Sequence, residues 1–175
     1  MTSVRIRDAE IADLDTITEI HNHAVLHTTA IWDEDETDVA ERTTWFADRL
    51  ASGYPVIVAI DEAGVLGYAS YGRWRPRTGY RLSVEHSVYV LDGQHGRGIG
   101  TMLMDELLTR ARAAGMHAMI AGIESGNTAS IALHKRLGFV EVGRMPQVGA
   151  KFGRWLDLSM LQLLLDDHAE PAPRP

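Results

Sequence analysis

The spacing of hydrophobic and polar residues changes between positions 83 and 115, and this change marks the centre of the chain. Residues 83–90 are rich in β-branched and aromatic side chains, as strands are. The apolar residues that follow recur at helical spacing: Ile99, Leu103, Leu107 and Ala111. The pattern predicts a strand, a glycine-rich turn and a helix in unbroken succession, with the rest of the fold built around them.

The turn has the composition of an anion site. It reads Gly93-Gln94-His95-Gly96-Arg97-Gly98-Ile99-Gly100. Glycines let backbone N–H groups converge, and the first amides of a helix have no partner within it, so a phosphate group suits this position. Arg97 would add a full positive charge. The alternative is a glycine-rich loop that only reverses the chain.

Two known phosphate motifs match this turn incompletely. A P-loop needs Gly-Lys-Ser/Thr where this chain has Gly98-Ile99-Gly100-Thr101, and a dinucleotide fingerprint needs a third glycine at Thr101. The second motif keeps one supporting residue, because Glu124 closes the next predicted strand, where a ribose-binding acid would lie. A nucleotide-binding oxidoreductase therefore stays open as an alternative.

A strand, two helices and a hairpin are predicted before this junction. Val4 and Ile6 alternate with arginines in the strand. The first helix is expected to carry an apolar stripe of Ile11, Leu14, Ile17 and Ile20 and to fade near His21, His23 and His27. The second helix is expected to be capped by Thr37 and ended by Gly53. Its inward-facing residues would be Val39, Phe46 and Leu50. The hairpin pairs residues 55–60 with 65–71.

Two other features of this half bear on binding. His23 and His27 have the i, i+4 spacing of metal ligands, but no acidic residue lies in register as a third ligand, so no metal site is expected. The apolar segment 28–32 either packs against the core or uses Ile31 and Trp32 to wall a small-molecule pocket.

A basic loop enters the central strand. It reads Arg73-Trp74-Arg75-Pro76-Arg77, and the strand that follows bears Glu85. A solvated loop is the simpler interpretation. Arginine also binds carboxylates through a bidentate fork, so the loop is a candidate anion site next to Glu85.

The remaining elements follow the long helix. Gly115 is expected to stop it, a strand at 117–123 to pair in parallel with the central strand, and Asn127 to cap a short helix that Gly138 closes. The last predicted strand covers 152–165, with Leu156, Leu158 and Met160 on one face. We predict one domain, residues 1–165, and a disordered proline-rich tail at 166–175.

Composition narrows the functional classes. With 175 residues and a formal charge of −7, the chain has the size of one domain and disfavours nucleic acid and anionic membranes as partners. It has no cysteine, which excludes disulfides, thiolate catalysis and cysteine-ligated zinc. No signal peptide or long apolar segment is evident, so we expect a cytoplasmic protein.

Two motifs in this order resemble the GCN5-related N-acetyltransferases (GNAT). They are the turn from His95 to Gly100 and the helix from Asn127 to Phe139, which ends His134-Lys135-Arg136-Leu137-Gly138-Phe139. Within that superfamily, the stretches 83–90, 145–149 and 151–155 look like phosphinothricin and methionine sulfoximine/sulfone acetyltransferases. The resemblance covers nearly the whole predicted domain.

The resemblance implies an α/β (α+β) fold, in which a mixed central sheet, flanked by about four helices, splays open at an acetyl-CoA site. No metal is implied. The cofactor-binding residues would be Val88, Tyr89, Val90, His95, Gly96, Arg97, Gly98, Ile99, Gly100, Thr101, Asn127 and Lys135. The family usually has Gln or Arg where His95 stands, so weaker CoA contacts are expected there.

Acetyl transfer to an amine needs a base, an oxyanion donor and a thiolate that can leave. Glu85 is our candidate base, and the Val88 amide is the candidate oxyanion donor. His134 is a candidate acid for the departing sulfur, although a thiol pKa of roughly 8.5 makes a thiolate a tolerable leaving group. The plainer alternatives are a surface glutamate and a helix-surface histidine.

The resemblance also implies the acceptor, a small amino-acid analogue such as phosphinothricin, methionine sulfoximine or methionine sulfone. Arg75 is our choice for its carboxylate, since a clamp beside the base would fix the geometry. The substrate-binding residues would be Ile31, Trp32, Arg73, Arg75, Pro76, Arg77, Glu85, His86 and Ser87. A homodimer is implied as well, with residues 148–152 closing the neighbouring site.

Two further alternatives remain. A CoA-binding sensor without turnover would share the fold, although it would need neither Glu85 nor His134. An acetyltransferase for another amine or a protein N-terminus would leave Arg75 without a carboxylate to bind. The sequence does not rank sulfoximine, sulfone and phosphinate acceptors, because pocket shape decides between them.

Overall fold

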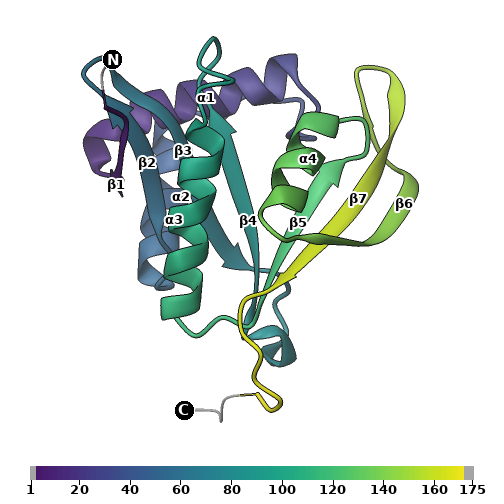
Figure 1. The fold of residues 1–175 in the computed structure, drawn as a ribbon. Coiled ribbons are helices and arrows are strands. Elements are labelled where there is room, and N and C mark those ends of the chain that lie inside the picture. The colour runs from purple at the N-terminus through teal and green to yellow at the C-terminus, as the bar shows by residue number, and fades with distance from the viewer. Residues whose placement is uncertain (1–2, 172–175) are drawn as a thin grey trace.

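A single mixed sheet organises the protein in the computed structural model, which describes residues 3–171. Its seven strands lie in the order β1-β2-β3-β4-β5-β7-β6 (Figure 1). The strands are β1 Arg5–Asp8, β2 Val56–Asp61, β3 Gly64–Arg73, β4 Ser83–Val90, β5 Ala118–Glu124, β6 Val140–Lys151 and β7 Arg154–Leu164. The α-helices are α1 Leu14–His27, α2 Val39–Ala51, α3 Ile99–Ala113 and α4 Thr128–Arg136.

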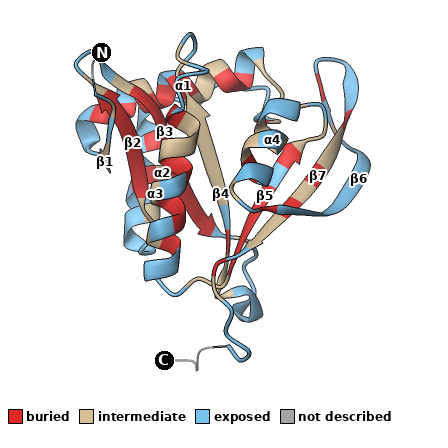
Figure 2. Cartoon of the chain, in the orientation of Figure 1, coloured by how far each residue is buried: buried red, intermediate tan, exposed pale blue. Residues whose placement is uncertain are grey.

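The sheet buries side chains on both faces. Along β2, Val56, Val58 and Ile60 pack with α1 and α2, whereas Ile57 and Ala59 pack with α3 on the opposite side. A strand covered on both faces needs an unbroken apolar run, which is what β2 has. Figure 2 shows burial concentrated in this half of the sheet and an exposed β6.

The central junction is as predicted. β4 leads through the glycine turn into α3, whose Ile99, Leu103, Leu107 and Ala111 are each no more than 1% exposed. β4 and β5 run parallel and pair only from Ser83↔Ala118 to Glu85↔Ile120. Beyond that point they diverge, as Figure 1 shows, so the predicted splayed sheet with four α-helices is confirmed.

Helix α1 departs from the sequence prediction at its N-terminal end. Ile11 lies in a short 3-10 turn and is 74% exposed, so it is not part of the apolar stripe. The helix ends at His27, the last of the three histidines near which it was expected to fade. Asn22 holds the chain beyond it, because its side-chain amide both donates to and accepts from the backbone of Thr37.

Helix α2 was predicted with the wrong cap and the wrong inner face. Asp38, not Thr37, is the N-cap, because its carboxylate accepts from the Glu41 amide at 2.8 Å. Phe46 is buried as expected, but Val39 and Leu50 are 41% and 52% exposed.

The C-terminal hairpin was predicted as a single strand. Residues 140–151 form β6, which lacks an apolar alternation because the strand is exposed at the sheet edge. Two register shifts against β7 accompany its glycines and proline. Of the predicted tail, Asp166 lies 2.9 Å from the His117 ring nitrogen, and residues 172–175 fall outside the described part of the chain.

Candidate active site

A cavity of about 640 Å³ opens where β4 and β5 separate, lined by both strands, the start of α3 and α4. Backbone bonds of β4 show which edge faces it. The Ser83 carbonyl accepts from Trp74, and the Leu91 amide donates to Leu66, both toward β3. Backbone polar groups alternate between the two edges of a strand, so those of Val88 and Val90 point toward the cavity.

The glycine turn forms the wall at the α3 end. Gly93, Gly96 and Gly98 have φ of 76°, 80° and 78°, in the left-handed region where side chains are strained. Gly98 is the N-cap of α3, and no side chain caps the first amides there. The described wall residues are Gln94, His95, Gly96, Gly98, Ile99, Gly100 and Thr101. These amides suit a phosphate group.

Three residues predicted near the cofactor differ in position. Arg97 turns toward the β2–β3 hairpin, where its guanidinium lies 3.2 Å from the Asp61 carboxylate, so its charge is already paired. Lys135 does not reach the cavity and lies 3.6 Å from Glu141, whereas Arg136 lines the wall instead. Asn127 lines the cavity, and its side chain caps α4 by accepting from the Ser130 amide at 3.1 Å.

Two histidines meet on the α4 side of this cavity. The rings of His86 and His134 stack at 4.9 Å, with their Nε2 atoms 3.0 Å apart. The Ser130 carbonyl lies 2.7 Å from Nδ1 of His134 and must accept a proton from it, which leaves Nε2 of His134 as the acceptor for His86. Nδ1 of His86 is then a bare acceptor, buried without a partner among the described residues.

Burial keeps this pair neutral. It lowers the pKa of His86 to about 3, with His134 adding to the effect, and it also lowers the pKa of His134 against the opposing bond to Ser130. His134 therefore has its one proton directed at a carbonyl rather than at the cavity. His86 was predicted beside the acceptor, but alternation along β4 places it on the α4 face, opposite Glu85 and Ser87.

Glu85 lies on the α1–α2 face of β4, between two glycines. Gly72 is its direct partner on β3, and on β5 a Cβ at Gly122 would lie 3.2 Å from Oε1 of Glu85. Burial raises the pKa of Glu85, while the charges of Arg75 and Arg49 act against that rise. The residue as a whole is exposed, so solvent and small molecules can reach it.

The loop that follows α1 lies beside the cavity and is held in place by the β6–β7 turn of the same chain. Ile31 is buried, and the indole of Trp32 covers Gly149 and donates to the Thr29 carbonyl at 3.0 Å. Lys151, only 1% exposed, donates to the carbonyls of Thr28 and Ile31. Residues 148–152, expected at a neighbouring subunit, thus contact their own loop.

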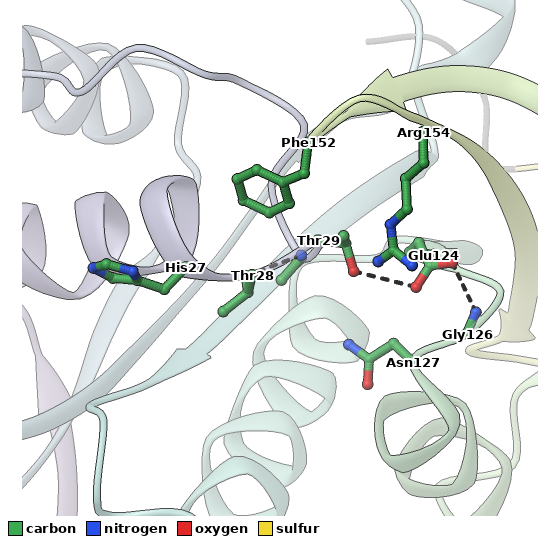
Figure 3. Close-up of a pocket in the computed structure, with 9 residues that line it drawn as sticks. His27, Thr28, Thr29, Glu124, Gly126, Asn127, Phe152 and Arg154 are labelled. Atoms are coloured by element: carbon green, nitrogen blue, oxygen red, sulfur yellow. Dashed lines mark hydrogen bonds between the residues drawn. The ribbon is translucent and has the colours of Figure 1, made fainter.

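A second cavity, of about 500 Å³, continues from the first along this loop. Figure 3 shows Phe152 and Arg154 above it, with Arg154 directed toward Glu124. The Glu124 carboxylate accepts from the Gly126 amide at 2.9 Å and from the Thr29 hydroxyl at 3.2 Å. It is engaged in fixing the loop, which does not favour the ribose-binding role considered for it.

The basic loop contributes unequally. Arg73, Arg75 and Arg77 are all exposed, and Arg75 lies 5.1 Å from the centre of the Trp74 ring. The Pro76 carbonyl accepts from Arg73 at 3.5 Å. Of the three arginines, Arg75 is the one whose charge acts on Glu85. The second cation that acts on Glu85 is Arg49 of α2, which the sequence reasoning missed.

Among the described residues, no helix is long and apolar enough to cross a membrane. Within the same range, no three His, Asp or Glu side chains cluster as ligands for a metal ion.

The model of the acetyltransferase (GNAT) family matches residues 17–139. An L-methionine sulfoximine/L-methionine sulfone acetyltransferase from Pseudomonas aeruginosa is 61% identical over 94% of this chain and 96% of its own length. A phosphinothricin N-acetyltransferase from Alcaligenes faecalis is 40% identical over 86% of this chain and 77% of its own.

Solved structures of acetyltransferases share the fold of this chain. The yncA protein from Salmonella typhimurium, solved with its cofactor acetyl-CoA, has a TM-score of 0.95 and 53% identity, covering 97% of this chain and 98% of its own. A ribosomal-protein-alanine N-acetyltransferase from Brucella melitensis has a TM-score of 0.90 and 51% identity, covering 91% of this chain and 99% of its own. The chain belongs to the GNAT acetyltransferase family.

Proposed function

We propose that this acetyltransferase moves the acetyl group of acetyl-CoA to the α-amino group of a small amino-acid analogue of the methionine sulfone, methionine sulfoximine or phosphinothricin type. The observation that carries the proposal is the arrangement of β4. Its open backbone edge faces the cavity, and the side chain of Glu85 projects from the α1–α2 face of the strand. The names of the relatives support the choice of acceptor.

The cavity fits acetyl-CoA, which would supply the thioester. Left-handed glycines and uncapped amides at the start of α3 suit a pyrophosphate, and the free edge of β4 suits the amides of a pantetheine arm. We assign the first contact to residues 96–101 and the second to Val88 and Val90, with Asn127 beside the arm. Gln94 and Arg136 join this set, and Arg97 and Lys135 have weaker claims, because each faces a carboxylate.

Glu85 takes the proton from the acceptor's ammonium group, directly or through water. The neutral amine nitrogen then forms a bond with the carbonyl carbon of the acetyl group. The carbon–sulfur bond breaks as CoA leaves as a thiolate, and one of the two protons left on the nitrogen passes to that thiolate, which gives the amide and CoA as a thiol. The Val88 amide, which points toward the cavity, donates to the oxyanion in between. His134 has a secondary role in this scheme, because its proton is held by Ser130.

Release of CoA from acetyl-CoA in the presence of each acceptor tests the proposal. Methionine sulfone, methionine sulfoximine and phosphinothricin should each raise release well above an acceptor-free control, and ordinary amino acids should do so less. Binding of CoA without acceptor-dependent release would favour a sensor without turnover.

One other acceptor class has support. The Brucella melitensis neighbour is named a ribosomal-protein-alanine N-acetyltransferase, so a peptide that begins with alanine belongs in the same assay. A peptide that outperforms the three amino-acid analogues would replace them as the substrate class.

We further propose, from the sequence and the family resemblance, a homodimer that works in the cytoplasm. Light scattering on the purified protein should then give twice the chain mass of 19.3 kDa.

A further inference from the structure

The guanidinium of Arg49 fills the place of a side chain on the central sheet. A Cβ added at Gly72 would lie 1.4 Å from Nη1 and 2.5 Å from Cζ of Arg49. Gly72 pairs directly with Glu85 across β3 and β4, and opposed residues in a sheet project on the same face. The glycine thus leaves room for the guanidinium of Arg49 on the face of the sheet that carries Glu85, the proposed base.

Arg49 has no carboxylate partner in the part of the chain that the structure describes. No described acidic group lies within ion-pair distance, and its buried Nε has no hydrogen-bond partner there. The Trp45 ring is 5.9 Å from the guanidinium carbon, a distance at which it offers only a weak contact. A half-buried guanidinium without an anion is costly, so this position favours an anionic ligand.

The chemistry of an α-amino acid indicates which anion would bind to Arg49. Its carboxylate and amine share one carbon, so a base that takes the amine proton must stand next to the cation that holds the carboxylate. Arg49 meets that requirement through Gly72, and Arg75 meets it from the loop before β4. Guanidinium groups also match a carboxylate in geometry, through two parallel N–H donors.

We propose that Arg49, seated over Gly72, binds the carboxylate of the acceptor and, together with Arg75, holds the amino acid at Glu85. This inference rests on the proposed function and adds the residue that makes the enzyme select amino acids over simple amines. A role limited to packing against Trp45, or to keeping Glu85 ionised, is the competing explanation.

Pairing a variant with a truncated acceptor separates these roles. Methionine sulfone and 3-(methylsulfonyl)propan-1-amine, which lacks the carboxylate, are compared in the wild type and in Arg49→Gln at saturating acetyl-CoA. The variant should raise KM for methionine sulfone about 10-fold or more and change KM for the amine less than about 2-fold. Equal losses with both acceptors, no loss with either, or a fall in kcat with a displaced acidic limb would overturn the proposal.

A second pair of variants leaves Arg49 in the chain. Gly72→Ala places a Cβ where the guanidinium of Arg49 lies, so this variant should reproduce the rise in KM for methionine sulfone. Gly143→Ala is the matched control, because a Cβ at that position of β6 meets open space. Thermal melts verify that both variants fold. A wild-type KM in folded Gly72→Ala would count against the proposal.

Failure of the proposed function can be distinguished from failure of the carboxylate site. If the wild type acetylates no amino acid, calorimetry still measures binding of methionine sulfone to the CoA-loaded protein, with and without Arg49. Weaker binding in Arg49→Gln would support the carboxylate site, and identical binding in both proteins would refute it.

Discussion

The environment of Glu85 is determined by the residues beside it on the neighbouring strands. Gly72 and Gly122 stand on the neighbouring strands, and neither has a side chain to cover the carboxylate. Burial raises the pKa of Glu85, which makes it a better proton acceptor, and the charges of Arg75 and Arg49 act against that rise. An enzyme that moves a proton from an ammonium group needs this balance.

Replacing the carboxylate by an amide tests this role. Glu85→Gln should lower kcat by about 100-fold or more, the usual worth of a general base, because glutamine has a similar shape but takes no proton. Acetyl-CoA affinity, measured by calorimetry, should stay at the wild-type value, since Glu85 projects away from the α4 side of the cavity. Unchanged kinetics in this variant would remove Glu85 as the base.

Two elements that are distant in sequence lie against each other on the side where we propose that the acceptor binds. The loop after α1 is pinned by the β6–β7 turn, through the buried ammonium of Lys151 and through the contact of Trp32 with Gly149. Burial lowers the pKa of Lys151, and its two carbonyl partners take up its donors in place of water. The hairpin therefore supports the loop that we propose as one wall of the acceptor site.

Removing the lysine charge should loosen this support. Lys151→Met leaves two carbonyls without their donor and should lower the free energy of unfolding by about 2–3 kcal/mol, measured by urea denaturation. Lys135→Met is the control, because that ammonium lies at the surface beside Glu141. Equal unfolding midpoints in the two variants would mean that Lys151 does not anchor the loop.

The contact between loop and hairpin has a separate test. In Gly149→Ala the new Cβ would lie 2.2 Å from two carbons of the Trp32 ring, so the indole must move. KM for the acceptor should rise about 3-fold or more, with KM for acetyl-CoA unaffected. Gly143→Ala, in open space on the same strand, is the matched control, and kinetics identical to it would show that Trp32 does not line the acceptor pocket.

Sequence patterns succeeded where one local rule decides the structure. The glycine turn followed by a regular apolar stripe fixed β4 and α3, and Asn127 and Gly138 fixed the ends of α4. The alternation along β4 also places His86: it shares a face with Val84 and Val88, which assigns it to the α4 side.

The failures have a common cause, which is that tertiary contacts override local composition. The inner face of α2 presents Arg42, Phe46 and Arg49, at i, i+4 and i+7, but arginines count as polar in a hydrophobic pattern. β6 has an exposed surface on both faces and shows no alternation to detect. The pairing of Arg97 with Asp61 joins residues 36 positions apart, which no local motif reveals.

Three histidines in the described part of the chain, buried His134 and partly buried His21 and His86, are held as neutral rings. Burial lowers the pKa of His21 to about 4 and that of His86 to about 3, and it lowers that of His134 as well. The unfolded chain binds protons at these sites below its own pKa of 6.5, where the folded protein does not. Stability is therefore fully present above that pH and is lost as the pH falls toward the folded-state values.

The free energy of unfolding should accordingly fall between about pH 6.5 and 4, by about 1.4 kcal/mol per pH unit for each histidine involved. His86→Phe keeps an aromatic ring against His134 and Phe139 but removes one titrating histidine. The slope of its unfolding free energy against pH should therefore be smaller than that of the wild type by the contribution of one histidine. Urea denaturation at a series of pH values measures both slopes. Parallel curves for the two proteins would contradict the assignment.

Acetylation of methionine sulfone by the purified protein decides between an enzyme and a CoA-binding protein. Mass spectrometry of the acceptor, run beside a thiol assay, counts the N-acetyl product formed for each CoA released. We expect one N-acetylated methionine sulfone per CoA, with both products nearly absent in Glu85→Gln. CoA release without an acetylated acceptor, or no release at all from a protein that binds acetyl-CoA, would contradict the proposed transfer.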